Sequence, residues 1–262
     1  MSQILAVTPS HENVLASNEV ATRQSSASSN PTVLADVYNN ECNIAIWQRS
    51  LDPEFATQLE SYVQNGGKLT AARQLNVDNA VSYIKTLADD QPFAPQLHAY
   101  IAELVDMFAY LFEANTVGFR LSTLDRAMCP RFHVDRVPCR LVTTFLGPGS
   151  QWIEHAAVDR SKLGHRSNSS NDVEWGLIRS IHDINALQTG DVALLKGELW
   201  QGNENAGIVH RSPPVPANQP RAHFIGRVCV MSSRGGSCVI VTRVIAVPFC
   251  ACAYGEKCMK WR

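Results

Sequence analysis

The sequence predicts an α+β fold in which helices from the N-terminal part pack on the outside of a double-stranded β-helix, a barrel of the jelly-roll or cupin-like type. Two observations support this prediction. Residues 92–114 repeat apolar side chains at intervals of three and four, the period of a helix with one buried face. From Val117 onward the pattern changes to short extended runs broken by glycine, proline, asparagine and serine, as in barrels of antiparallel strands.

The chain is expected to divide into three parts. Residues 1–30 are rich in serine, asparagine and threonine without a sustained period, which predicts a flexible leader. Residues 31–248 are expected to form a single domain, since a chain of 262 residues is long enough for one large core. Residues 249–262 form a cysteine-containing tail of unclear structure, in which the paired spacing of a zinc site is missing.

Several elements can be placed inside this domain. Residues 43–49 are rich in β-branched and aromatic side chains and suggest a short strand. Asp52 as N-cap and Pro53 at the first helical position predict a helix that ends at Gly66. The remaining expected strands are residues 117–124, 140–146, 151–154, 192–195, 207–210, 221–231 and 238–247.

Composition excludes some classes of function. The 23 lysines and arginines nearly balance the 24 aspartates and glutamates, and the net charge of −1 gives no overall attraction to nucleic acid or to an anionic membrane. The N-terminus lacks the basic and apolar regions of a signal peptide, and no long apolar run is present. We therefore expect a soluble, cytoplasmic protein whose eight cysteines are reduced.

One short motif points to a metal site. His133 and Asp135 are two residues apart, so on an extended backbone their side chains project to the same face. His210, arriving from a neighbouring strand, would complete a set of two imidazole nitrogens and one carboxylate oxygen. Such a set leaves positions free for a co-substrate and dioxygen on Fe(II). The alternative is structural: His133 hydrogen-bonded to a carboxylate, or Asp135 paired with Arg136.

Arg221 is the candidate for binding the co-substrate. It follows His210 by eleven residues, beyond a proline-rich crossing at residues 213–220. If the two strands are neighbours, the guanidinium points into the metal cavity, where its planar fork suits a bidentate contact with a carboxylate. We assign Arg221 to the distal carboxylate of a 2-oxo acid.

These features together resemble the Fe(II)/2-oxoglutarate-dependent oxygenases. The shared pattern is His-x-Asp, a Gly190-Asp191 turn that opens an apolar strand, a later histidine, and an arginine about ten residues after it. The resemblance implies a double-stranded β-helix, iron held by His133, Asp135 and His210, 2-oxoglutarate anchored by Arg221, and hydroxylation as the reaction.

Four stretches are similar to a more specific group, the bacterial family catalogued as domain of unknown function 1826. They are residues 43–49, 132–136, 200–203 and 209–213, and the similarity extends over roughly residues 33–230. This resemblance implies the extent of the domain and no particular reaction.

Five further residues are candidates for the cavity or the substrate. Arg131 shares the face of His133 if that segment is extended, and its alternative is a salt bridge at the mouth of the barrel. Arg140 and Thr144 lie on one face of their strand and are candidates to line the cavity. Trp200 and Asn203 lie in a glycine-containing loop before His210, either as a substrate-contacting loop or as an ordinary hairpin turn.

Other functions remain open at this point. Zinc suits two imidazoles and a carboxylate as well as iron does, so a metal-binding module without turnover is one alternative. A cupin-like isomerase or hydrolase that uses its metal as a Lewis acid is another. We expect the substrate to be a small molecule or an amino-acid-type group, and the sequence does not predict the oligomeric state.

Overall fold

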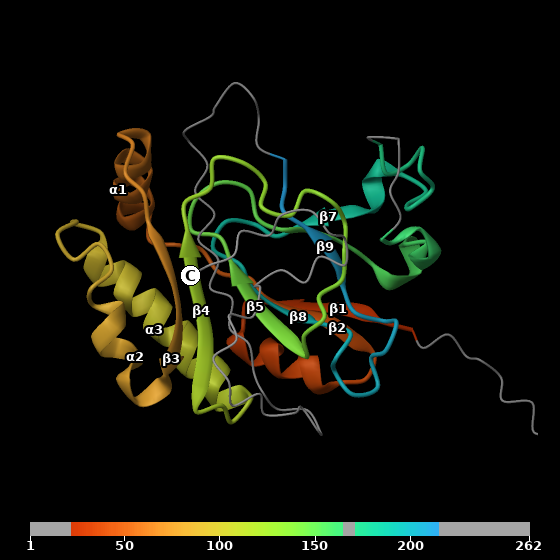
Figure 1. The fold of residues 1–262 in the computed structure, drawn as a ribbon, viewed down its shortest axis with the longest axis horizontal. Helices are drawn as coiled ribbons and strands as arrows, with labels where there is room; N and C mark the ends of the chain where they lie inside the picture. Colours follow the sequence, from red (N-terminus) through yellow and green to blue (C-terminus); the bar gives the residue numbers. More distant parts are fainter. Residues whose placement is uncertain (1–21, 165–170, 215–262) are drawn as a thin grey trace, which may run out of the picture.

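A computed structural model describes residues 22–164 and 171–214, which form a mixed α+β fold. Within these residues nine strands form three separate sheets of four, two and three strands. The α+β class is confirmed. Figure 1 shows helices α1, α2 and α3 together with the two-stranded sheet on one side of the molecule, and β7 and β9 towards the other.

The four-stranded sheet is the centre of the fold, and its strand order is β1-β2-β8-β5. The 3-10 helix η1 connects β1 to β2, which run parallel, whereas β8 is antiparallel to both β2 and β5. Every residue of β5 and β8 is buried, so both faces of the sheet are covered. The bounds are β1 (Gln24–Ser28), η1 (Pro31–Tyr38), β2 (Cys42–Trp47), β5 (Cys139–Thr143) and β8 (Val192–Lys196).

Strand β1 corrects the expected flexible leader. It lies within residues 1–30, so regular structure begins before residue 31. Its sequence, QSSAS, shows no apolar alternation, and none of its residues is buried. Backbone pairing with β2 therefore holds the strand in place. Composition therefore did not reveal it.

The two predicted helices are confirmed. Helix α1 (Pro53–Gln64) begins after Asp52, whose side chain accepts a hydrogen bond of 2.9 Å from the amide of Phe55. It ends before Gly66, whose φ of +86° is a conformation that favours glycine. Helix α3 (Ala94–Leu111) occupies the apolar repeat.

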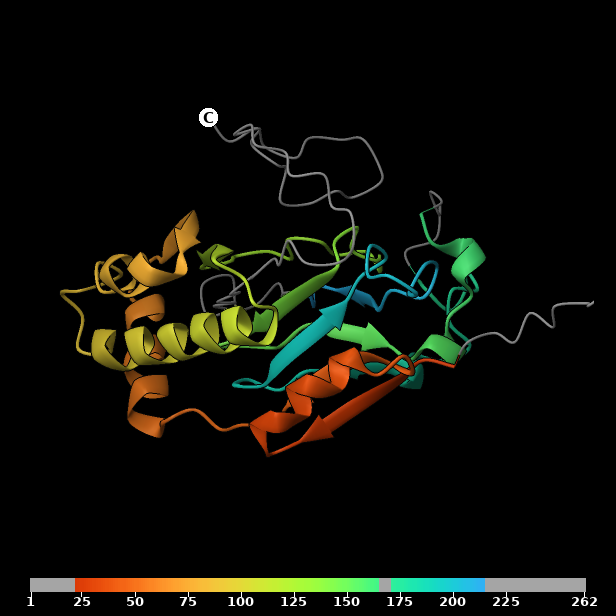
Figure 2. The ribbon, with the colours of Figure 1, turned by 90° about the horizontal axis from the view of Figure 1, so that it is seen from below.

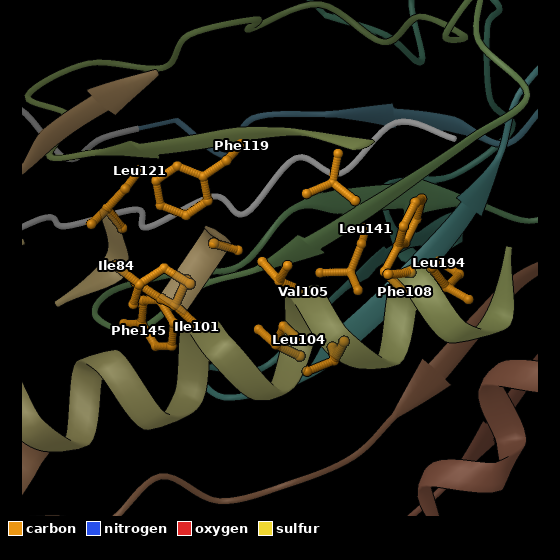
Figure 3. Close-up of a cluster of buried hydrophobic side chains, with 14 of the residues drawn as sticks. Ile84, Ile101, Leu104, Val105, Phe108, Phe119, Leu121, Leu141, Phe145 and Leu194 are labelled. Carbon is orange, nitrogen blue, oxygen red and sulfur yellow. The ribbon is translucent and has the colours of Figure 1, made fainter. Parts of the chain in front are cut away.

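Helix α3 covers one face of the central sheet and forms the main core. Its buried side chains at three- and four-residue spacing meet Leu141 of β5 and Leu194 of β8, as Figure 3 shows. Helix η1 lies beside β2 (Figure 2), and its Val33, Leu34 and Val37 belong to the same core. The two-stranded sheet and α2 complete this core; their bounds are β3 (Thr70–Asn76), α2 (Val77–Ile84) and β4 (Thr116–Ser122).

The three-stranded sheet lies over the other face of the central sheet. Trp152 of β6 packs in one apolar cluster with Val142 and Leu195 of the central sheet, and His210 of β9 is its direct partner across the strands. Because directly opposite residues in a strand pair project to the same face, His210 also faces the central sheet. The bounds are β6 (Gln151–Ile153), β7 (Ile184–Ala186), β9 (Val209–Arg211), and the 3-10 helices η2 (His155–Ala157), η3 (Arg160–Lys162) and η4 (Ile181–Asp183).

The α+β class is confirmed, but the expected double-stranded β-helix barrel is not. The expected strands up to residue 210 all have counterparts, but the sheets of residues 22–164 and 171–214 do not close into a barrel. The expected strands at residues 221–231 and 238–247 lie outside the described residues. In the part of the chain that is described, no helix combines the length and apolarity needed to cross a membrane.

Candidate metal centre

Backbone pairing brings the two histidines together. His133 and His210 form an antiparallel bridge in which each amide donates to the other residue's carbonyl, at 3.0 and 2.9 Å. Their ring centroids are 4.6 Å apart. His210 lies in β9, and His133 lies in the extended segment before β5. The expected arrival of the second histidine from a neighbouring strand is thus found.

Asp135 is held against the end of β8. Its carbonyl accepts a hydrogen bond of 2.9 Å from the amide of Glu198. The neighbouring Gly197 allows this approach, because a Cβ at that position would collide with the carbonyl oxygen of Val137 and would lie 2.8 Å from that of Asp135. The lack of a side chain at Gly197 therefore helps to set the position of Asp135.

The three side chains converge on a small volume. One ligand atom from each of His133, Asp135 and His210 lies within 4.8 Å of the other two. The Nε2 atom of His133 is 3.8 Å from Oδ1 of Asp135, and that of His210 is 3.4 Å from Oδ2. His210 and Asp135 are buried, and the side chain of His133 is 17 % exposed.

Hydrogen bonds fix which nitrogen of each ring faces the cluster. Nδ1 of His133 lies 2.9 Å from the carbonyl of Arg131, and Nδ1 of His210 lies 3.2 Å from the carbonyl of Ile208. A carbonyl oxygen only accepts, so in each neutral ring Nδ1 carries the hydrogen and Nε2 presents a lone pair. Backbone carbonyls commonly orient metal-binding histidines in this way.

This arrangement fits a metal cation. Two nitrogen lone pairs and a carboxylate converge, and acceptors repel one another unless a proton or a cation lies between them. The buried Nε2 atom of His133 has no hydrogen-bond partner within residues 22–164 and 171–214. A divalent metal would satisfy all three groups at once.

Electrostatics keep His210 neutral, as a metal ligand requires. Burial is the main cause that lowers its pKa to about 3, while Asp135 acts in the opposite direction and His133 and Arg140 lower it further. The imidazole therefore carries no competing proton at neutral pH.

Arg140 joins the cluster from β5. Its Nε atom forms an ion pair of 3.0 Å with Oδ2 of Asp135, and the residue is 8 % exposed. Arg140 pairs in register with Leu195, which belongs to the apolar cluster between the sheets, so the guanidinium also lies on that face. The sequence marked Arg140 as a cavity candidate but did not indicate that it pairs with Asp135. The structural alternative for Asp135 was a pair with Arg136.

The other predicted site residues have different surroundings. Arg131 is an exposed residue, and its backbone carbonyl lies 2.9 Å from Nδ1 of His133. Thr144 is buried just beyond β5, and its carbonyl accepts from Gly190 at 2.8 Å. Arg221 lies outside the described residues.

Trp200 and Asn203 support the loop before His210. Asn203 is buried, donates to the carbonyl of Gly197 at 3.1 Å and accepts from Nε of Arg23 at 2.8 Å. The ring of Trp200 lies 5.3 Å from that of Tyr38. Both side chains therefore have partners within the fold, as the hairpin-turn alternative expects, and their contact with a substrate stays a prediction.

Two supporting residues were missed by sequence reasoning. Gly197 ends the apolar run of β8, and a glycine directly after a buried strand is a signal of close backbone approach. Arg23 reaches across 180 positions to Asn203, a contact that no local pattern predicts.

The fold and the cluster together define an α+β protein with a two-histidine, one-carboxylate site between two sheets. The family described as "Protein of unknown function (DUF1826)" matches residues 28–225, and the chain belongs to this family. None of the curated proteins matches the chain.

Proposed function

We propose that this protein is an Fe(II)/2-oxoglutarate-dependent dioxygenase that hydroxylates a small-molecule or amino-acid-type substrate. The observation that carries the proposal is the convergence of Nε2 of His133, Nε2 of His210 and the carboxylate of Asp135 within 4.8 Å. Two imidazoles and one carboxylate are the ligand set of the non-heme iron oxygenases, and they leave positions open for other ligands.

The proposal extends to the fold. Two sheets that face each other across the cluster of Trp152, Val142 and Leu195 are what a double-stranded β-helix requires. Residues 221–231 and 238–247, expected from the sequence to be strands, lie outside the described residues. The proposal assigns to Arg221 the role of anchoring the distal carboxylate of 2-oxoglutarate through its planar fork.

The roles of the protein groups follow from their positions. His133, Asp135 and His210 would hold the metal, and the carbonyls of Arg131 and Ile208 orient the two rings. Burial between the sheets limits access of water to the site. Iron bound there would supply hydroxylation of a C–H bond by dioxygen, coupled to conversion of 2-oxoglutarate to succinate and carbon dioxide.

The test is an anaerobic titration of the purified protein with Fe(II) and 2-oxoglutarate, followed by the visible charge-transfer band of the ternary complex. We expect a band in the wild type, loss of it in His133→Ala, and a weaker band in Arg221→Ala. His182→Ala is the matched control, because His182 is exposed and lies on η4.

Two other results would redirect the proposal. Tight binding of zinc, with iron binding that gives no band at any 2-oxoglutarate concentration, would exclude the dioxygenase and favour a metal-binding module. A metal-dependent isomerase or hydrolase would bind the metal but consume neither dioxygen nor 2-oxoglutarate.

A further inference from the structure

An apolar pocket with a volume of about 140 Å³ lies between η1 and α3. Leu141 of β5 and Leu194 of β8 line its buried inner end, and Phe108 of α3 lies beside them (Figure 3). These residues belong to the core on the face of the central sheet that α3 covers. The metal cluster lies across the sheet, on the face of Arg140, so the pocket is separate from that site.

The lining of the pocket determines the chemistry of a ligand. None of the described residues that line it is charged, and only Thr32 and Tyr110 contribute hydroxyl groups. A charged or strongly polar group would lose its hydration in this space without gaining a partner. An apolar group would leave water and gain van der Waals contacts. The pocket therefore favours an uncharged, apolar ligand.

The volume of the pocket determines the size of that ligand. Protein interiors are closely packed and contain few voids larger than a water molecule, because the atoms around an empty space lose contacts. An apolar cavity of about 150 Å³ stays free of water and binds a molecule such as benzene. The 140 Å³ between η1 and α3 is thus enough for one six-membered ring or a branched chain of similar bulk.

The pocket is partly open to solvent, unlike a closed packing defect. Two of its lining residues, Ala35 of η1 and Tyr110 of α3, are exposed, and Tyr110 is 86 % exposed. Tyrosine combines an apolar ring with a polar hydroxyl, which suits the boundary between an apolar space and water. Met107 also lines the pocket and is only partly buried. Its unbranched side chain can change rotamer to fit a ligand.

We propose that this pocket is a binding site for one small, uncharged apolar molecule of about the size of a benzene ring. The ligand binds between η1 and α3, against Leu141 and Leu194. This site is additional to the proposed metal centre and requires no metal.

The experiment uses the full chain and two probes, benzene and benzoate. Nuclear magnetic resonance of methionine methyl groups labelled with ¹³C follows binding, and Met107→Leu assigns the signal of Met107. We expect benzene to shift this signal in a saturable way and to raise the temperature of unfolding. The signal of Met128, which does not line the pocket, should stay unchanged. Benzoate should bind about tenfold more weakly or worse, because its charge would have no partner.

Ala35→Leu tests the location by adding carbon atoms at the mouth of the pocket. We expect it to weaken benzene binding by about tenfold or more, since the larger side chain competes for the same space. Ala156→Leu is the matched control, because Ala156 is also an exposed alanine in a 3-10 helix, η2, and does not line the pocket. Benzene affinity in this control should equal that of the wild type.

Several results would overturn the proposal. The first is the absence of a saturable shift of the Met107 signal in the wild type, and the second is equal affinity for benzene and benzoate. If Ala35→Leu does not fold or its new side chain turns to solvent, Met107→Phe fills the pocket from α3. Unchanged benzene binding in this variant, measured by thermal unfolding, would also contradict the site. A wild-type dimer in sedimentation that Ala35→Arg makes monomeric would assign the pocket to a second copy of the chain instead.

Discussion

The two faces of the central sheet differ in what they bury. On one face, Leu141 and Leu194 meet apolar side chains of α3 and η1 in a continuous core. On the other, Arg140 and Leu195 face the three-stranded sheet, and charged side chains are buried next to apolar ones. The adjacent residues Arg140 and Leu141 of β5 therefore lie on opposite faces of the sheet, because side chains alternate along a strand.

This difference has a direct consequence for mutations. Side chains on the helix face contribute hydrophobic burial, so their loss lowers the free energy of unfolding. The side chains of the His133, Asp135 and His210 cluster on the opposite face bury a charge and nitrogen lone pairs. Such groups stabilise the fold only when each has an ion-pair, hydrogen-bond or metal partner. Substitutions on the two faces should therefore separate stability from metal binding.

The largest expected effect is on the helix face. Phe108 is 1 % exposed, and its ring centroid is 4.4 Å from that of Phe112. Phe108→Ala should lower the free energy of unfolding by about 3–5 kcal/mol, through lost burial and the cavity that remains. Urea denaturation measures the change. Metal affinity of the folded fraction should stay the same, and a loss above tenfold would show that the two faces are not independent.

The next effect sharpens the comparison from the other face. A metal that binds only the folded state should raise the free energy of unfolding by about 2.7 kcal/mol when present at 100 times its dissociation constant. Thermal unfolding of the wild type with and without Co(II) measures this shift. In His210→Ala the shift should vanish, while in the exposed His182→Ala it should remain in full. An unchanged shift in His210→Ala would place the metal elsewhere.

A third prediction concerns Lys196, which lies at the end of β8 directly before Gly197 and is 1 % exposed. Burial is the main cause that lowers the pKa of its ammonium group to about 8; Cys42 and Cys139 oppose this shift, and Arg23 adds to it. Its Nζ atom donates to the carbonyl of Asn39 at 2.9 Å.

The sign of the pH dependence follows from linkage. Between pH 8 and the ordinary lysine value of 10.5, the unfolded chain binds more protons at this position than the folded chain does. Stability from this group should therefore rise with pH across that window, by up to about 1.4 kcal/mol per unit. Urea denaturation of wild type and Lys196→Met between pH 7 and 10.5 tests it. Equal slopes in the two proteins would contradict a lowered pKa.

The smallest expected effect provides a baseline away from both the cluster and the sheet. Asp52→Ala removes the side chain that caps α1 through the amide of Phe55 and should lower the free energy of unfolding by about 1 kcal/mol. Asp52→Asn should recover most of this loss, because an asparagine also caps well. A change in Co(II) affinity in either variant would mean that lower stability of the whole fold is enough to weaken metal binding. Effects on the two faces of the central sheet could then not be separated.

Local signals in the sequence were enough for the elements whose stability is local. The cap at Asp52, the stop at Gly66 and the apolar repeat of α3 each predicted a boundary within a few residues. The His-x-Asp spacing likewise predicted that His133 and Asp135 would come together. Each of these predictions depends only on residues a few positions apart, and their identities can be read from the sequence.

Other features depended on contacts between distant segments. Strand β1 carries polar residues, and it is a strand because β2 offers backbone partners. The pairing of Asp135 with Arg140 rather than Arg136 follows from the register of β5 on β8. The contacts of Trp200 with Tyr38 and of Asn203 with Arg23 join segments far apart in the chain.

By itself, then, the sequence determined the α+β class, the two longest helices and the identity of the three converging side chains. Only the tertiary structure decided which face of the sheet they occupy, which nitrogen each ring presents and which cation accompanies the carboxylate. The reason is physical: periodicity and caps act within a few residues, whereas charge neutralisation and ligand geometry depend on atoms brought together from β5, β9 and the end of β8.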